Sequence, residues 1–331
     1  MSFKYISTFV FISFLNILYS QEQNTIFSKK IDSISICSFN VQFLGHFKNR
    51  EDSLLAELLK PYDVVVIQEM VAPPISGTYP DLSRFKKDKE SASFTNKMIQ
   101  NGFSFWLSPE DTGPKRNHTN STSSEWWITF YKPEILIPDS SKFYGFLDSI
   151  TVASSKYQRV PYSMPFMSSL DSSHLFSLIS LHLQPGNRPN DREIRANELS
   201  NLVKWSKEHG DSSTILLLGD CNIYTSNEYV PYNDIGFYSL NDRCEFTNTK
   251  MYEDSTKGKP YDHVFYLKDS MNHWYLDHFE VIDLMDYYKK TIPPPLFNFE
   301  PYDHDLFRTS FSDHLPITFK FYYITIDQHS N

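Results

Sequence analysis

The sequence predicts an α/β fold, because apolar segments typical of strands alternate along the chain with segments that carry a helical apolar stripe. Residues 63–68 and 175–183 are nearly continuous apolar runs, as expected for strands covered on both faces. Residues 191–209 instead place Leu199 and Leu202 near one side of a helix, which Gly210 ends. These observations favour buried sheets with helices against them.

The remaining elements follow from the same local signals. Residues 33–41 form the first strand candidate, and a helical stripe follows that Pro61 ends; its members are Leu54, Leu55, Leu58 and Leu59. Another helix ends at Gly102. Further strands are expected at residues 125–131, 213–218, 261–267, 279–284 and 315–323. Residues 225–259 are loop-rich, and the prolines of 292–295 indicate a surface loop.

The composition excludes several classes of protein. The chain has 331 residues, 40% of them hydrophobic and 21% charged, which is typical of a globular protein and not of a disordered one. The net charge of −9 argues against wholesale coating of a polyanion. It leaves room for a local phosphate site that includes its own metal cation.

Residues 1–20 are expected to be a secretory signal peptide. Lys4 precedes an apolar run that ends at Tyr19, and Ser20 is a small residue at the expected cleavage point. The alternative is a membrane anchor, but the run is shorter than the roughly 20 apolar residues of a spanning helix and contains Ser7 and Asn16. We therefore expect a secreted or periplasmic protein without a stable membrane anchor.

Three cysteines allow one disulfide at most. Cys221 and Cys244 are the conceivable pair, but Cys37 and Cys221 adjoin apolar strands, which favours buried, inert thiols. Asn117 and Asn120 fit the pattern for N-glycosylation.

Polar residues stand at the ends of the apolar strands. Asn40, Glu69, His182 and the pair Asp220 and Asn222 each follow such a strand. One of these alone is usually a cap, a turn residue or a structural histidine. Four together indicate a shared site, because ligands bind beyond the carboxyl ends of strands in α/β sheets and unused ionisable groups are costly to bury there.

Two later motifs extend this set. Asp262 begins one strand, and Asp313 and His314 directly precede the last one. Carboxylate and amide oxygens favour Mg²⁺, Ca²⁺ or Mn²⁺, and the spacing typical of a zinc site is not seen.

These motifs, in this order, resemble the endonuclease/exonuclease/phosphatase superfamily, the DNase I-like fold. The resemblance runs from Ile34 to Tyr323. The matching segments are residues 39–41, 67–69, Glu125 before an aromatic strand, Arg159, residues 181–182, 219–222, 261–263 and 312–316. It implies one domain over residues 21–331, a four-layered α/β sandwich of two packed mixed β-sheets flanked by helices.

The resemblance also implies the roles of the site residues. Glu69 would be the principal metal ligand, with Asn40 and Asp313 near it. The cofactor would be Mg²⁺, with Mn²⁺ or Ca²⁺ as alternatives. Asp220 and Asn222 would position the attacking water and the phosphate. His182 and His314 would flank the phosphate, with Glu125 as the carboxylate partner of His182 and Asp262 as that of His314. Arg159 would support the site or the phosphate.

We therefore expect a secreted, monomeric, metal-dependent phosphodiesterase, specifically an endonuclease whose substrate is DNA. The alternatives are an enzyme for another phosphoester, such as a sphingomyelinase or a phosphoinositide phosphatase, and a non-catalytic binding protein.

The Arg and Tyr with which DNase I-type enzymes contact the minor groove are replaced by Val71 and Ser123. Basic residues in the loops offer local positive charge, namely Lys115, Arg116, His118, Arg188, Arg192, Arg195, Lys257 and Lys259. Trp126 and Trp127 could stack on bases, but they are expected to be core or rim residues.

Overall fold

A computed structural model of the chain describes residues 29–48, 50–111, 125–147, 157–169, 175–210, 214–271, 274–292 and 300–326. Within these residues, a six-stranded mixed sheet has the order β14 (Trp274–Val281), β15 (Ile317–Ile326), β1 (Lys29–Leu44), β2 (Val64–Met70), β6 (Trp126–Tyr131) and β5 (Ser104–Leu107). A seven-stranded mixed sheet has the order β12 (Phe237–Ser239), β13 (Asp262–Leu267), β11 (Thr214–Asp220), β10 (Leu175–His182), β9 (Tyr162–Ser168) and β7 (Leu136–Pro138), with β8 (Gly145–Phe146) beside β9. A small hairpin joins β3 (Gly77–Thr78) and β4 (Arg84–Phe85).

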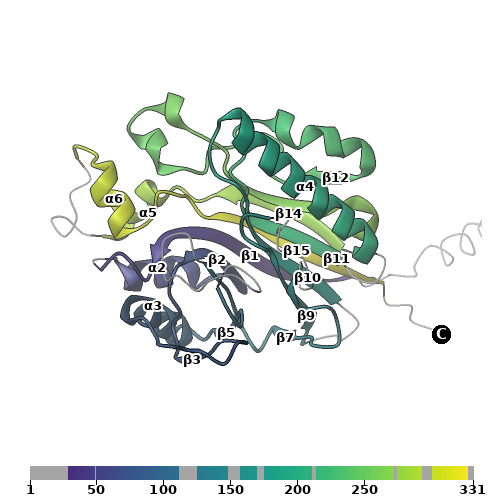
Figure 1. The fold of residues 1–331 in the computed structure, drawn as a ribbon, viewed down its shortest axis with the longest axis horizontal. Helices are drawn as coiled ribbons and strands as arrows, with labels where there is room; N and C mark the ends of the chain where they lie inside the picture. Colours follow the sequence, from purple (N-terminus) through teal and green to yellow (C-terminus); the bar gives the residue numbers. More distant parts are fainter. Residues whose placement is uncertain are drawn as a thin grey trace, which may run out of the picture.

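Each large sheet contains a parallel pair whose crossover includes a helix. The parallel strands β1 and β2 are connected through α2 (Asp52–Leu59), and β10 and β11 through α4 (Pro189–His209). The other helices are α3 (Lys89–Gln100), α5 (Leu284–Thr291) and α6 (His304–Ser310). Figure 1 shows α4 on one side of the molecule and α2 and α3 on the opposite side, with the two sheets between them. The expected four-layered α/β sandwich is confirmed.

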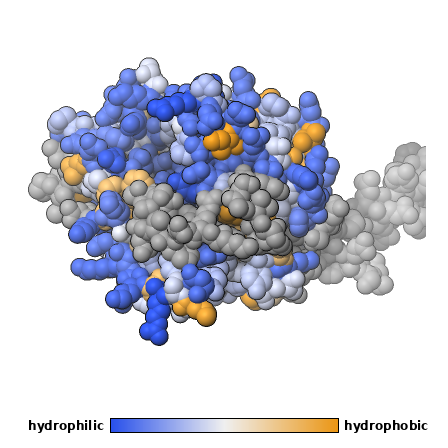
Figure 2. Space-filling view, in the orientation of Figure 1, coloured by the Kyte–Doolittle hydropathy of each residue, from blue (hydrophilic) through white to orange (hydrophobic). Residues whose placement is uncertain are grey.

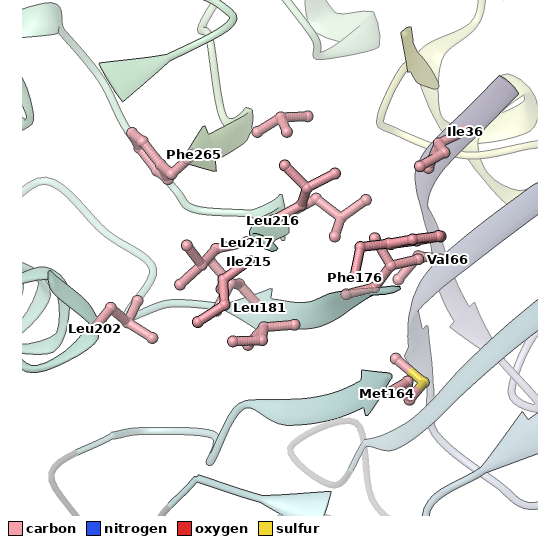
Figure 3. Close-up of a cluster of buried hydrophobic side chains, with 14 of the residues drawn as sticks. Ile36, Val66, Met164, Phe176, Leu181, Leu202, Ile215, Leu216, Leu217 and Phe265 are labelled. Carbon is pink, nitrogen blue, oxygen red and sulfur yellow. The ribbon is translucent and has the colours of Figure 1, made fainter. Parts of the chain in front are cut away.

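Alternation along the central strands explains why the sheets pack face to face. Successive side chains of a strand point to opposite faces. Ile36 and Val66 therefore share a core with Leu216 of the other sheet (Figure 3). Phe39 and Ile67, at odd positions relative to these, belong to a second core that contains the apolar side chains of α2 and α3. One pair of strands thus has two buried faces.

One expected strand is wrong at both ends. The sequence predicts a strand at residues 279–284, whereas β14 begins at Trp274 and ends at Val281. Trp274 stacks on Phe321 of β15 with 3.9 Å between ring centroids. The burial of Trp274 in this contact is consistent with a strand that begins earlier in the chain than the sequence predicts. Leu284 begins α5 instead, because the side chain of Asp283 caps that helix by accepting from the backbone N–H of Asp286.

The sequence also misses β9, which pairs with β10 although it contains Pro165. Proline is uncommon inside sheets, so the local pattern argues against a strand there. The loop-rich character of residues 225–259 is confirmed. That segment contains β12 and the short 3₁₀ helices η2 (Ser226–Glu228), η3 (Val230–Ile235), η4 (Thr249–Tyr252) and η5 (Ser255–Lys257), and η6 (Lys268–Ser270) follows β13.

The cysteines are unpaired. Cys37 and Cys221 are fully buried, and burial raises the pKa of both thiols, so the interpretation as inert thiols is confirmed. The segment predicted to be a signal peptide, the two glycosylation motifs and the prolines after Ile292 lie outside the described residues. Among the helices of the described part, none has the length and apolar character that crossing a membrane requires.

Gly219 allows β11 to approach β10 closely. Its φ is +145°, and a Cβ there would lie 2.1 Å from the carbonyl oxygen of Leu181. Gly102 also has a positive φ, +90°, but a Cβ there would have no heavy atom of the described structure within 4 Å beyond its own chain neighbours. Alanine at either site has a strained backbone, and only at Gly219 does it also collide with a neighbouring strand.

We expect Gly219→Ala to lower the free energy of unfolding by at least about 2 kcal/mol more than Gly102→Ala does. Urea denaturation of the two variants and the unmodified protein measures this difference. Equal destabilisation by both substitutions would contradict the close approach.

Candidate functional site

The predicted site residues meet at one edge of the two sheets. Asn40, Glu69, His182 and Asp220 lie at the carboxyl ends of β1, β2, β10 and β11. The strands β6, β13 and β15 run antiparallel to β2, β11 and β1, so they begin at the same edge. Glu125, Asp262 and His314 stand at or just before those beginnings. The expectation of a shared edge is confirmed.

Asp220 lies at the centre of this group and is almost fully buried. Its Oδ2 accepts a hydrogen bond from Asn40 Nδ2 at 3.0 Å. The same oxygen lies 3.4 Å from Nε2 of His182 and 3.5 Å from Nε2 of His314. Its other oxygen accepts from the backbone N–H of Asn222 at 2.9 Å. One carboxylate therefore contacts residues from both sheets.

His182 is oriented by a carboxylate that contacts Nδ1, the ring nitrogen that does not face Asp220. Its Nδ1 lies 2.9 Å from Oε2 of Glu125, which also lies 3.2 Å from Nε of Arg159. Arg159 Nη1 is buried and has no hydrogen-bond partner within the described part of the chain. The side chain of Asn222 is tied to the same strand end, since its Nδ2 donates to the carbonyl of Leu183 at 3.1 Å. The predicted association of Glu125 with His182 is present.

His314 has an equivalent arrangement. Its Nδ1 lies 2.8 Å from Oδ2 of Asp262. Its backbone N–H donates to Ser312 Oγ at 3.0 Å, and that hydroxyl donates to the carbonyl of Asn40 at 2.6 Å. This connection fixes the segment before β15 against the end of β1. Both histidines thus direct Nε2 at Asp220 and Nδ1 at a second carboxylate.

The charges of His182, His314 and Asp220 stabilise one another. Burial opposes protonation of His314, but the carboxylates of Asp262 and Asp220 outweigh it and raise its pKa well above the ordinary value. Burial and Arg159 likewise oppose protonation of His182, and Glu125 and Asp220 raise its pKa. Against its own burial, Asp220 has a lowered pKa because the two imidazolium charges face it. The site therefore favours two cationic histidines around one carboxylate.

Glu69 and Asp313 form the acidic side of the site. Oε1 of Glu69 accepts from Asn40 Nδ2 at 2.9 Å, and Oε2 accepts from the backbone N–H of Phe43 at 3.1 Å. Glu69 itself has φ +61°, and its N–H donates to Glu125 at 2.7 Å. Burial raises the pKa of Glu69, and the negative charge of Asp313 adds to this effect.

Two residues that the sequence analysis missed hold this acidic side in place. Gln42 Nε2 donates to Asp313 Oδ2 at 2.7 Å, and its backbone N–H donates to Asn40 Oδ1 at 2.9 Å. Arg50 is buried and donates to the backbone carbonyls of Val41, Gln42 and Phe311. Gln42 lies two residues beyond Asn40 and shares its polar strand end, but no local signal identifies Arg50.

The donor set fits a hard divalent cation. Oδ1 of Asp313 is buried and, within the described residues, has no hydrogen-bond partner. Glu69, His182 and Asp220 bring ligand atoms within 4.8 Å of one another, as do Asp220, Asp262 and His314. Carboxylate oxygens dominate these groups, which suits Mg²⁺, Mn²⁺ or Ca²⁺. Asn40 contacts the carboxylates through its NH₂ group, while its oxygen accepts from Gln42.

Several residues considered in the sequence analysis lie outside this constellation. His263 faces the core, where Ser239 and the carbonyl of Pro260 bind its two nitrogens and burial lowers its pKa to about 4. Trp126 and Trp127 are fully buried, as expected. Lys115, Arg116, His118 and Ser123 lie outside the described residues.

The sequence has no match among protein-family models and none among curated proteins. Solved structures do match. An endonuclease/exonuclease/phosphatase family protein from Bacteroides thetaiotaomicron is 13% identical, with a TM-score of 0.56, and the match covers 89% of this chain and 99% of that one. TDP2 from D. rerio, complexed with a single-strand DNA product, is 15% identical with a TM-score of 0.54, covering 88% and 99%.

A third match is ANGEL2, described as a 2′,3′-cyclic phosphatase and solved with adenosine-2′,3′-vanadate. It is 12% identical with a TM-score of 0.54, and the match covers 90% of this chain and 99% of that one. At these identities the likeness concerns the backbone. The chain therefore has the four-layered α/β fold of the endonuclease/exonuclease/phosphatase proteins, the DNase I-like fold.

Proposed function

We propose that the protein is a divalent-metal-dependent phosphodiesterase, specifically an endonuclease that hydrolyses DNA, and that it is exported after removal of residues 1–20. One observation carries this proposal. Two histidines, each paired with its own carboxylate, face the ionised Asp220 beside the acidic pair Glu69 and Asp313. Phosphoester hydrolysis needs the same three functions: a cation site, an acceptor for water, and proton donors near the phosphate.

The two histidines would bind the phosphate. Because Nδ1 of each is held by a carboxylate, each protonated ring presents its Nε2–H to the interior of the site. A phosphate oxygen placed there accepts a charge-assisted hydrogen bond from either ring. Arg159 Nη1, which is buried without a partner in the described structure, supplies a further donor.

Asp220 would receive the proton of the attacking water. Its lowered pKa keeps the carboxylate ionised, and the backbone N–H of Asn222 holds one of its oxygens. Its other oxygen faces both imidazoles, so a water bound there lies between the proton acceptor and the phosphate donors. Glu69 and Asp313 would hold the cation, which neutralises phosphate charge when bound.

DNA is the proposed substrate for two reasons. The D. rerio TDP2 structure, which has the same fold, was solved with a single-strand DNA product. The coloured surface in Figure 2 is mainly hydrophilic, with small separate hydrophobic areas, which suits a water-soluble polyanion better than a lipid surface. Val71 is buried, so a minor-groove contact of the DNase I type is not made from that position.

A substrate panel tests the proposed function directly. We expect the purified protein to convert supercoiled plasmid DNA to nicked circles in the presence of Mg²⁺ or Mn²⁺, and EDTA to abolish this reaction. RNA, sphingomyelin, phosphoinositides and a 2′,3′-cyclic nucleotide serve as the comparison substrates. Cleavage of one of these with intact plasmid would contradict a DNA endonuclease, and no hydrolysis at all would contradict the enzyme.

The metal site has a test that does not need turnover. We expect Glu69→Ala to weaken Mn²⁺ binding, measured by isothermal titration calorimetry, by at least about 10-fold, because a carboxylate ligand is lost. Glu57→Ala is the control, since Glu57 is exposed and pairs only with Lys60 among the contacts of the described structure. Equal Mn²⁺ affinity in both variants would remove Glu69 from the metal site.

The pairing of Asp262 with His314 predicts a change in pH dependence. Asp262 raises the pKa of His314, so the protonated ring persists at neutral pH and is lost as the pH rises through that pKa. In Asp262→Asn this charge is gone, and the alkaline fall of kcat/KM should begin about one pH unit or more lower. Asp254→Asn, in an exposed turn, should leave the profile unchanged. Identical profiles for all three proteins would contradict the pairing.

A further inference from the structure

Glu198 is a fully buried carboxylate in α4 that lies outside the constellation described above. Its two oxygens each accept one backbone hydrogen bond. Oε1 accepts from the N–H of Gln158 at 2.6 Å, and Oε2 accepts from the N–H of Gln184 at 2.8 Å. One side chain therefore connects the segment that leads into β9 with the segment that follows β10, beyond Tyr162 and Ser180, the last residues that these two strands pair.

Both segments carry residues of the site. Gln158 directly precedes Arg159, whose Nε lies 3.2 Å from Glu125. Gln184 follows His182 by two residues, and the Nδ1 of His182 lies 2.9 Å from the same oxygen of Glu125. The contacts form a closed ring that runs from Glu198 through Arg159, Glu125 and His182 back to Glu198.

Arg195, one turn earlier in α4, extends these contacts to a third segment. Its Nη1 donates to the carbonyls of Gln184 and Gly186 at 2.8 and 2.9 Å, and its Nε donates to Glu228 at 2.7 Å. Glu228 in turn accepts from the N–H of Tyr224, two residues after Asn222. Arg195 is completely buried, so it does not supply the substrate-facing charge that its sequence position suggested.

The negative charge of Glu198 is compensated by hydrogen bonds and by nearby positive charges. Burying a carboxylate is costly unless it is hydrogen-bonded and paired. Burial raises the pKa of Glu198, while the two amides and the positive charges of Arg159 and His182 act in the opposite direction. A neutral side chain at this position would accept fewer backbone hydrogen bonds and would lack the attraction to Arg159 and His182.

We propose that Glu198 is a positioning residue for the phosphate-binding side of the site: it holds the segments that carry Arg159 and His182 at the spacing that Glu125 requires. This role rests on the proposed phosphodiesterase function. Within the described residues Glu198 has hydrogen bonds to the backbone of Gln158 and Gln184 and none to Asp220, so it acts through the segments that carry Arg159 and His182. Its effect should therefore depend on whether His182 is present.

The first test compares two matched variants of the full chain on the same helix. Glu198→Gln is expected to lower kcat/KM for plasmid cleavage by about 10-fold or more, in the range typical of residues that orient a functional side chain. Glu193→Gln makes the same chemical change on the exposed side of α4 and should retain the activity of the unmodified protein. Full activity of Glu198→Gln would overturn the proposal.

A double-mutant cycle then separates positioning from a general loss of structure. In a His182→Ala background, Glu198→Gln should reduce the remaining rate by clearly less than about 10-fold, because one of the two groups through which it acts is already absent. The same factor of about 10 in both backgrounds would show independent effects and overturn the proposal.

Hydrogen exchange provides a readout without turnover. The amides of Gln158 and Gln184 should exchange slowly in the unmodified protein, and faster in Glu198→Gln but not in Glu193→Gln. Exchange of these amides at the rate of an unstructured peptide in the unmodified protein would overturn the proposed role of Glu198, even if the Glu198 variant fails to fold. A protein that hydrolyses no substrate but shows this protection would contradict the proposed function and retain the structural role of Glu198.

Discussion

The buried negative charge of Asp220 is the constraint on which the site depends. A buried carboxylate is stable only when charges and hydrogen bonds compensate it. Here His182 and His314 face one oxygen, and the N–H of Asn222 binds the other. Each histidine has a carboxylate of its own, Glu125 or Asp262, which acts together with Asp220 to raise its pKa. The compensation of a single charge therefore organises residues from several strands.

The packing of the two sheets determines how these residues meet. Asp220 belongs to the seven-stranded sheet, whereas its partner Asn40 belongs to the six-stranded one. Near this edge the apolar core between the sheets gives way to a polar contact, in which Gln68 donates to Ser38 and Ser180. Gly219 has no side chain at this point, which allows β11 to lie close to Leu181 of β10 and to Gln68 of the other sheet. Changes in sheet spacing would therefore alter the distances among the site residues.

Much of the fold and site was predictable because its signals are local. A buried strand that ends in a charged residue is visible in the sequence, so Glu69, His182 and Asp220 could be found without a structure. The limits of β14 could not, because they depend on stacking between Trp274 and Phe321, which are far apart in the chain. Arg50 and Glu198 were missed for a similar reason, since their partners are backbone groups of distant segments.

The sequence by itself determined the alternation of strands and helices, the polar residues at the strand ends and their order along the chain. These features depend on periodicity and on residue type, which are properties of neighbouring residues. Only the tertiary structure decided that Asp220 is the shared partner of both histidines, that Asn40 binds the carboxylates through its NH₂ group, and that Arg195 is buried. The physical reason is that hydrogen bonding and burial depend on which distant segments of the chain are in contact. Strand register and sheet packing determine those contacts.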